Sequence, residues 1–196
     1  MKSSIKRILS ICFLILIMTD SVSSKFLESK LVSFADAAAI ATITKDSESD
    51  LTNAIKTLNS NGGTIYINTK VINISTKSTI KLTGSKAGGI VGMKQSDGTY
   101  PVIDFTKARN AGSKARGFTI SGSNQYIKYL IIENSGDNGI WINGKKNTLD
   151  HVIARYNNDS GIQLSDGASG NTINYCYSEI LMLLIMGQMP MDLHLN

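Results

Sequence analysis

The fold is decided by three tetrapeptides, GFTI at 117–120, GIWI at 139–142 and GIQL at 161–164, which follow one another at intervals of 22 residues. Each tetrapeptide begins with a glycine, and its second and fourth residues are apolar. This alternation is typical of a strand with one buried face. Periods of about 20 to 50 residues built from short strands and turns indicate a solenoid, in which each repeat buries its apolar face only against its neighbours.

A second strand-like run follows each tetrapeptide, and no helical pattern lies between them. These runs are 127–133, 149–155 and 173–178, the last one displaced by two residues because the turn 165–170 is longer than the turn 143–146. Two or three short strands in 22 residues make one coil of a parallel β-helix. We therefore predict an all-β protein, a solenoid of stacked coils.

Stacking places equivalent residues of successive coils about 4.8 Å apart. We expect Glu133 and Arg155 to stack on the surface as an ion pair worth about 0.5 kcal/mol. Three columns should point inward: Ile127–Leu149–Ile173, Leu130–Val152–Cys176 and Ile140–Ile162.

Earlier coils and a helix are predicted upstream. Apolar residues at 51, 54, 55 and 58 share one helical face, with Ser49 or Asp50 as the N-cap and Asn61-Gly62-Gly63 ending the helix. This helix would cap the open N-terminal end and cover a sheet edge. Strands are expected around 64–67, 79–82, 89–91 and 102–105.

The first residues are typical of an export signal. A basic stretch, 1–7, precedes eleven almost continuously apolar residues, 8–18, too few to span a bilayer. We predict a signal peptide at 1–24, a leader or linker at 25–45, and a secreted protein with no membrane association after cleavage. A second cleavage motif at 35–37 lies far from the apolar run and is less favoured.

Composition excludes several protein classes. The 196 residues are 18% charged and 42% hydrophobic, unlike a disordered chain or a membrane bundle. Three of the 20 basic and one of the 15 acidic residues lie in the leader, so the net charge of +5 falls to +3 without it. That charge predicts no nucleic-acid partner, although it tolerates an anionic substrate. Since Cys12 lies in the leader, Cys176 has no disulfide partner, and we expect it to be a small core residue.

The last segment, 179–196, differs from the rest and holds four of the seven methionines. It is either a short apolar closing element or the product of a frameshift after the coils at 46–178. Reading residues 185–196 one base back permits Y-G-A-N-A-D-G-F-A-S-K, in which both glycines are obligatory and a Gly-Phe strand start reappears. We favour the out-of-frame interpretation, which leaves the β-helix incomplete at its C-terminal end.

Residues 45–178 resemble the N-terminal part of polysaccharide lyase family 9, the pectate lyase L type. The resemblance is carried by Gly122-Ser-Asn-Gln-Tyr-Ile-Lys, Glu133-Asn-Ser-Gly-Asp-Asn-Gly-Ile-Trp-Ile, Asn157-Asn-Asp-Ser-Gly-Ile-Gln-Leu and Asn171-Thr-Ile-Asn-Tyr-Cys-Tyr-Ser. It implies a right-handed parallel β-helix, monomeric when intact, that cleaves polygalacturonate, the acidic chain of pectin, by β-elimination with Ca²⁺.

Such an elimination removes a proton next to a carboxylate. Calcium on that carboxylate stabilises the developing charge, clustered aspartates hold the ion, and a lysine of lowered pKa can take the proton. The resemblance places the first calcium-binding aspartate in an N-A-D-G-F motif, which this chain has only in the shifted frame, and the other ligands and the lysine in later coils. We therefore assign no catalytic, cofactor-binding or metal-binding residue to this sequence.

Several residues are candidates for a functional site, and each also has a simpler structural interpretation. Asp137 and Asp159 are 22 residues apart and should stack on one turn, beside the column Asn138–Ser160. They could form an acidic surface that leads to the calcium site. We favour the simpler interpretation that both are turn residues that precede a glycine. Asp166 has the same turn interpretation.

The aromatic and basic candidates also have both a functional and a simpler structural interpretation. His151 should align with Tyr129 and Tyr175 in an outward column, where a surface stack is favoured over sugar contact, and Trp141 is interpreted in the same way. The pair at 145–146, two lysines, could attract a polyuronate, but a solvated turn is the default for such a pair.

The sequence therefore predicts a fragment of a secreted, calcium-dependent pectate lyase, inactive as encoded and of low solubility, and leaves open whether this chain is an enzyme. One alternative is a non-catalytic β-helical carbohydrate-binding or surface protein. Another is a different β-helix polysaccharide-degrading enzyme, such as a hydrolase.

Overall fold

The computed structural model describes residues 37–76, 79–110, 114–179 and 181–183. These all belong to one compact unit that begins at Ala37. The predicted signal peptide, the segment up to residue 36 and most of the predicted out-of-frame tail lie outside the described residues.

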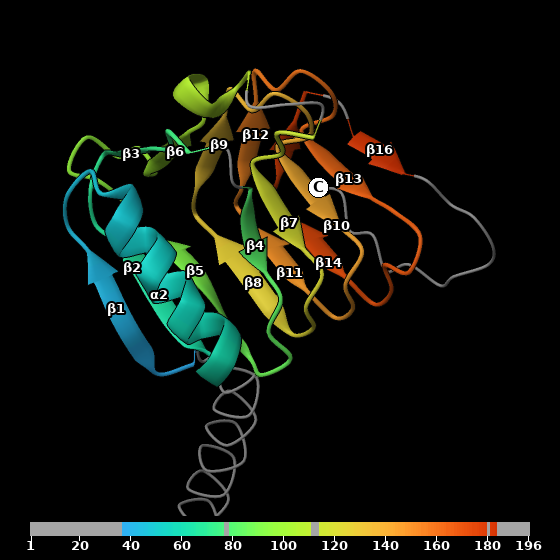
Figure 1. The fold of residues 1–196 in the computed structure, drawn as a ribbon, viewed down its shortest axis with the longest axis horizontal. Coiled ribbons are helices and arrows are strands. Elements are labelled where there is room, and N and C mark those ends of the chain that lie inside the picture. Colours follow the sequence, from blue (N-terminus) through green and yellow to red (C-terminus); the bar gives the residue numbers. More distant parts are fainter. Residues whose placement is uncertain (1–36, 77–78, 111–113, 180, 184–196) are drawn as a thin grey trace, which may run out of the picture. The chain divides into compact units, whose positions relative to one another are not determined.

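Three parallel sheets form the faces of the coils, and from residue 63 onward the chain passes from the first sheet to the second and then to the third in each turn (Figure 1). Sheet A contains, in spatial order, β1 (Ala39–Ile43), β2 (Gly63–Ile67), β5 (Gly88–Gly92), β8 (Gln125–Lys128), β11 (Thr148–Asp150) and β14 (Thr172–Asn174). Sheet B contains β3 (Val71–Asn73), β6 (Val102–Asp104), β9 (Ile131–Glu133), β12 (Ile153–Arg155) and β15 (Tyr177–Ser178). Sheet C contains β4 (Ile80–Leu82), β7 (Phe118–Ile120), β10 (Ile140–Ile142), β13 (Ile162–Leu164) and β16 (Leu181–Leu183). The predicted parallel β-helix is confirmed.

The register is the one that the 22-residue interval predicts. Ile140 pairs with Phe118 on one side and with Ile162 on the other. The amide of Gly139 donates to the carbonyl oxygen of Ser160, one coil further on, at 3.0 Å. Every expected inward column is found, with Cys176 half-buried against the core and the other members buried: Ile127–Leu149–Ile173, Leu130–Val152–Cys176 and Ile140–Ile162.

The expected surface ion pair is also present. Arg155 pairs in register with Glu133, and its Nε lies 2.8 Å from the carboxylate Oε2. The two side chains are 34% and 15% exposed, so solvent screens the attraction and its contribution stays below about 1 kcal/mol.

The second run of each coil is two strands rather than one. Tyr129 at φ 55° separates β8 from β9, and His151 at φ 53° separates β11 from β12. A left-handed residue turns the chain sharply, so one residue directs it from sheet A to sheet B. Tyrosine and histidine rarely signal such a bend, and for this reason the sequence showed one continuous run.

The one α-helix among the described residues, α2 (Glu48–Asn61), buries the predicted apolar face of Leu51, Ala54, Ile55 and Leu58. A short 3-10 helix, η2 (Thr106–Ala108), follows β6. The N-cap of α2 is Ser47, not Ser49 or Asp50, because the Ser47 hydroxyl accepts from the amide of residue 50 at 3.2 Å. The helix α2 ends at Gly62, whose φ of 75° favours glycine.

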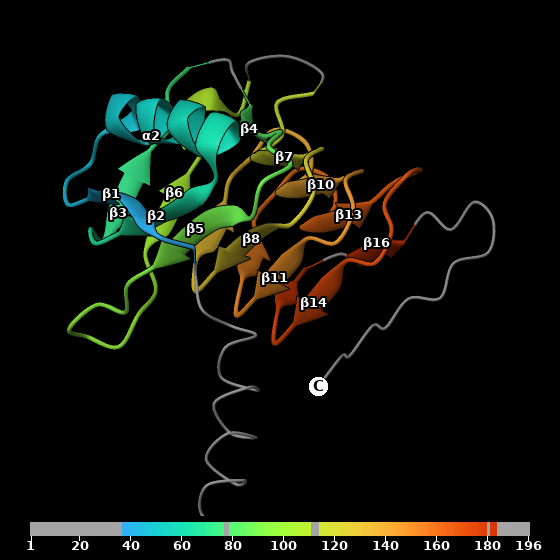
Figure 2. The ribbon, with the colours of Figure 1, turned by 90° about the horizontal axis from the view of Figure 1, so that it is seen from below.

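The helix caps the coil stack beside β4, as Figure 2 shows. Asn59 of α2 donates its side-chain amide to the carbonyl oxygen of Lys81 at 2.9 Å and accepts from the amide of Thr83 at 2.8 Å. These bonds satisfy edge groups of β4 that would otherwise be open to another strand. The predicted N-terminal capping helix is confirmed.

Two strands lie in segments for which we expected no coil. The strand β1 falls within 25–45 and pairs with β2, so the array of strands begins before residue 46. The strand β16 lies in the predicted out-of-frame tail, where Leu181 pairs with Ile162 of β13.

Buried amides connect the coils at the corner between sheets C and A. The Asn147 Oδ1 accepts from the backbone amide of Gln125 at 2.8 Å, and its Nδ2 donates to the carbonyl oxygen of Gly122 at 3.1 Å. Asn171 repeats the arrangement one coil later, accepting from the amide of Asn147 at 2.8 Å and donating to Gly144 at 3.0 Å. This ladder supplies hydrogen bonds where the chain turns and the strand ladder is interrupted.

Candidate functional site

The outer face of sheet C carries a column of four residues with polar or aromatic side chains, one from each of four successive strands. Lys81 pairs with Thr119, Thr119 with Trp141, and Trp141 with Gln163. Their neighbours on each strand are buried, so these four face outward; Lys81 is exposed and the other three are half-buried. We call Lys81, Thr119, Trp141 and Gln163 the outer column of sheet C.

Arg116, just before β7, lies against this column. Its guanidinium carbon is 4.2 Å from the centroid of the Trp141 ring, and its Nε lies 3.4 Å from the Asp137 carboxylate. Both charged side chains are only 20% exposed, and the Nε is buried without a hydrogen-bond partner. A guanidinium held between an indole and a carboxylate is oriented in advance, and its fork of donors matches a ligand carboxylate.

Asp137 and Asp159 stack as predicted, since the amide of Asp159 donates to the carbonyl oxygen of Asp137 at 3.3 Å. Their carboxylates contact side chains: Asp137 contacts Arg116, and Asp159 accepts from the Asn138 amide at 2.9 Å. The Asn138 amide also donates to the buried Ser160 hydroxyl at 2.8 Å. Asp137 lies in a bend, as the turn interpretation expects, but the sequence did not indicate its contact with Arg116.

The described residues do not fit a calcium ion. None of the described ranges contains a group of three or more acidic, histidine or cysteine side chains arranged to hold a metal. The two stacked carboxylates are already engaged, one by a guanidinium and one by an amide. We derive no chemical step through a metal at this position.

The predicted aromatic column lies at the corner between sheets A and B. The rings of Tyr129 and His151 are 4.9 Å apart and those of His151 and Tyr175 are 4.8 Å apart, while Tyr100 extends the column at 5.6 Å from Tyr129. The Nδ1 of His151 lies 2.8 Å from the Asp150 carboxylate. Because these rings cover one another's faces, the arrangement matches the surface stack favoured from the sequence.

The remaining sequence candidates lie in turns. Lys145 and Lys146 are exposed at the corner between sheets C and A, and Lys146 has φ 55°. Asp166 is exposed in a turn closed by a 3.0 Å hydrogen bond from Ala168 to Ser165. The solvated-turn interpretation fits all three, and the structure does not bring them to the outer column.

Cys176 is a free thiol whose environment suppresses reactivity. Burial raises its pKa to about 11, and the thiol donates to the carbonyl oxygen of Asn174 at 3.1 Å. Since the thiolate is the nucleophile, the raised pKa lowers the reactivity of this thiol, and the side chain packs against the core, as predicted.

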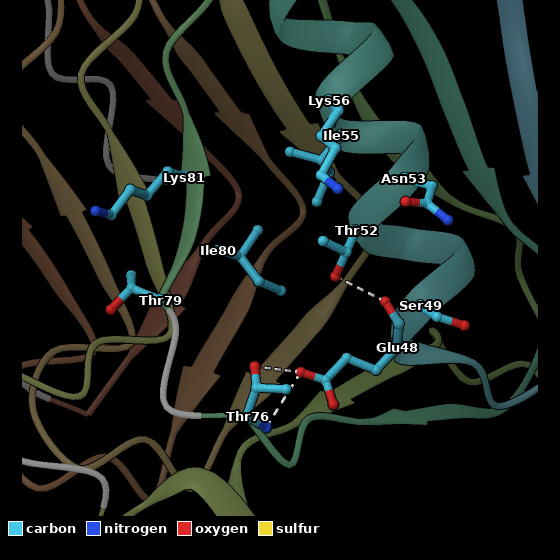
Figure 3. A pocket seen from close by; sticks show the side chains of 10 residues that line it. All are labelled: Glu48, Ser49, Thr52, Asn53, Ile55, Lys56, Thr76, Thr79, Ile80 and Lys81. Carbon is cyan, nitrogen blue, oxygen red and sulfur yellow. Dashed lines mark hydrogen bonds between the residues drawn. The ribbon is translucent and has the colours of Figure 1, made fainter.

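A groove of about 610 Å³ lies between α2 and β4, next to the outer column (Figure 3). No sequence pattern indicates this groove, because it exists only where the helix packs beside the strand. Its lining combines threonines, two isoleucines, two lysines and a glutamate: Glu48, Ser49, Thr52, Asn53, Ile55, Lys56, Thr76, Thr79, Ile80 and Lys81.

Four hydrogen bonds hold the carboxylate of Glu48, the acidic residue of this groove. The Glu48 carboxylate accepts from the amides of Ser75 and Thr76, at 2.9 and 3.2 Å, and from their hydroxyls, at 2.8 and 2.6 Å. Burial raises the pKa of Glu48, but these four hydrogen bonds outweigh it and lower the pKa below its usual value. The group is therefore charged at neutral pH.

No helix in the part of the chain that the structure describes is long and apolar enough to cross a membrane.

Comparison with known proteins places these features in a family context. The family model described as "Pel9A-like, right handed beta helix region" matches residues 31–179. Pectate lyase L of Paenibacillus polymyxa (strain SC2) is 34% identical over 106 residues, which are 53% of this chain and 23% of that protein. Pectate lyase L of Dickeya chrysanthemi is 27% identical over 73 residues, 37% of this chain and 17% of that protein. No solved structure matches.

The aligned part of the chain thus spans less than a quarter of either relative. The family description specifies a right-handed β-helix, in agreement with the handedness expected from the sequence resemblance.

Proposed function

The chain belongs to the family of Pel9A-like right-handed β-helix proteins, and on that basis we propose that it is part of a secreted pectate lyase whose described coils bind polygalacturonate. The name shared by the two curated relatives, pectate lyase L, supports this substrate class. The observation that carries the proposal is the Arg116 guanidinium, oriented by Asp137 and Trp141 on the outer column of sheet C.

The chemistry of the outer column suits an acidic sugar polymer. Strands repeat about every 4.8 Å, so the column offers contacts along an extended chain that lies across sheet C. The Arg116 guanidinium binds a uronate carboxylate, while the half-buried Trp141 and Gln163 supply an aromatic surface and an amide for the ring and its hydroxyls.

We place the cleavage chemistry outside the described coils. The family resemblance implies calcium-dependent β-elimination for the intact protein, and we propose that the calcium ligands and the base are encoded after codon 178, in the reading frame that restores the N-A-D-G-F motif. The 196-residue chain then binds polygalacturonate without cleaving it. Reading the DNA around codons 177–200 in three frames tests the frameshift itself.

An activity assay tests the enzymatic part. The product of the restored frame should release unsaturated uronides from polygalacturonate, seen as rising ultraviolet absorbance, with calcium and not with a chelator. The 196-residue chain serves as the matched comparison and should release none. A restored product that binds polygalacturonate but releases no uronides would overturn the lyase assignment.

That last outcome would favour the second candidate, a non-catalytic carbohydrate-binding β-helix. The specific observation behind it is that Arg116 and Trp141, a guanidinium and an aromatic ring suited to an acidic sugar, lie together on the outer face of the described coils.

A further inference from the structure

The groove between α2 and β4 combines the groups that a uronate residue needs. Figure 3 shows the helix residues Thr52, Ile55 and Lys56 on one side, with Ile80 and Lys81 of the strand on the other. The isoleucines offer an apolar surface to a sugar ring. The Thr52 hydroxyl donates to the backbone carbonyl oxygen of Glu48 at 2.8 Å, so its oxygen can still accept a hydrogen bond from a sugar hydroxyl. Two ammonium groups supply positive charge.

These two cations are available. Lys56 and Lys81 are exposed, and neither has an ion-pair partner within the described ranges. Asn59, which bonds to the backbone of Lys81, lies three residues after Lys56 on α2 and therefore on the same helix face. The two lysines thus belong to the same end of the groove.

The negative charge of the groove lies at its other end. Glu48 precedes Lys56 by eight residues, about 12 Å along the helix axis, and its carboxylate is occupied by Ser75 and Thr76. It therefore does not neutralise the lysines. With two lysines at one end and the Thr52 hydroxyl oxygen as an acceptor beside them, the groove fits a ligand that carries both a carboxylate and hydroxyl groups, rather than a small polyanion.

The groove also continues the outer column of sheet C. Lys81 is the first member of that column, two strands from Trp141, or about 10 Å at the usual strand spacing. A polymer lying on Trp141 and Arg116 reaches the lysines if it extends toward the helix.

We propose that Lys56, Lys81 and the hydroxyls of the α2–β4 groove form a second uronate subsite, which binds another galacturonate residue of the polymer held by Arg116 and Trp141. This subsite rests on the proposed function and deepens it. It is a binding site only, and it makes the N-terminal helix part of the polysaccharide-binding surface as well as a cap.

The test uses the full 196-residue chain and calorimetric titration with tetragalacturonate. The double variant Lys56→Gln/Lys81→Gln should bind roughly fivefold more weakly or worse, the loss expected from two screened ion pairs, and its affinity should depend less on salt. The control Lys94→Gln/Lys146→Gln removes the same charge from exposed positions outside the groove and should change affinity less than twofold. Far-ultraviolet circular dichroism verifies that both variants fold.

The outcomes separate the two proposals. If the wild-type chain binds tetragalacturonate and Arg116→Gln weakens it, but the groove variant behaves like the control, the second subsite is refuted and the proposed function stands. If the wild-type chain does not bind, both are refuted. A neutral galactose tetramer that binds as tightly as tetragalacturonate would also overturn the subsite, since its lysines would have no role.

Discussion

Replacing Asn147 with alanine should destabilise the β-helix far more than its position in a turn suggests. The side chain is 1% exposed and makes two hydrogen bonds between coils, accepting from Gln125 and donating to Gly122. Asn147→Ala leaves a buried amide and a buried carbonyl unpaired, each costing about 1–3 kcal/mol. We expect a total loss of about 2–6 kcal/mol, a large share of the roughly 5–15 kcal/mol that stabilises a typical domain.

The assay is urea unfolding followed by circular dichroism, with Lys145→Ala as the control. Lys145 lies in the same turn, but its side chain is exposed, so its removal should change stability by less than about 0.5 kcal/mol. Asn147→Asp gives a second readout: the carboxylate still accepts from Gln125 but donates to Gly122 only when protonated, so this variant should be less destabilised at low pH. Equal midpoints for Asn147→Ala and Lys145→Ala would refute the reasoning.

Three further predictions concern register, packing and pH. In a background without native cysteines, the double variant Thr148→Cys/Thr172→Cys should form a disulfide, because the two residues are paired on adjacent strands and their Cα atoms lie within bonding range. A control pair in which one cysteine is moved two residues along its strand should not form a disulfide. Equal oxidation of the two double variants would contradict the register. Leu149→Ala should lower the free energy of unfolding in urea by about 2–5 kcal/mol, because the leucine is fully buried between two coils. A loss of stability no larger than that of Thr148→Ala would argue against an inward column. Burial raises the pKa of Glu48 in the folded chain, but its hydrogen bonds outweigh burial and lower the pKa overall. The contribution of Glu48 to the free energy of unfolding is therefore complete above its unfolded pKa and disappears as the pH falls through its folded pKa. Glu48→Gln should therefore show a weaker loss of thermal stability on acidification than the wild-type chain, and identical pH profiles would contradict this.

The repeating parts of the fold were predictable because they follow from local rules. Glycines at 117, 139 and 161 set the interval, and alternation fixed which side chains point inward. The buried face of α2 followed from its helical period. These features depend on neighbouring residues in the sequence or on equivalent positions in adjacent coils.

The parts that sequence reasoning missed depend on contacts between different segments. Tyr129 and His151 adopt left-handed conformations that their residue types do not signal. Arg116 precedes its strand and reaches Trp141 only because one coil lies on the next. The groove at Lys81 exists because α2 packs beside β4. The candidate site was therefore less predictable than the fold.

The most direct test of the account is affinity electrophoresis of the 196-residue chain in gels that contain either polygalacturonate or neutral galactan. If the outer column of sheet C binds acidic pectin chains, the protein is retarded only by polygalacturonate, and Arg116→Gln reduces this retardation while Lys94→Gln does not. Equal mobility in both gels, or equal retardation of the two variants, would contradict the claim that Arg116 and Trp141 form a polygalacturonate-binding surface.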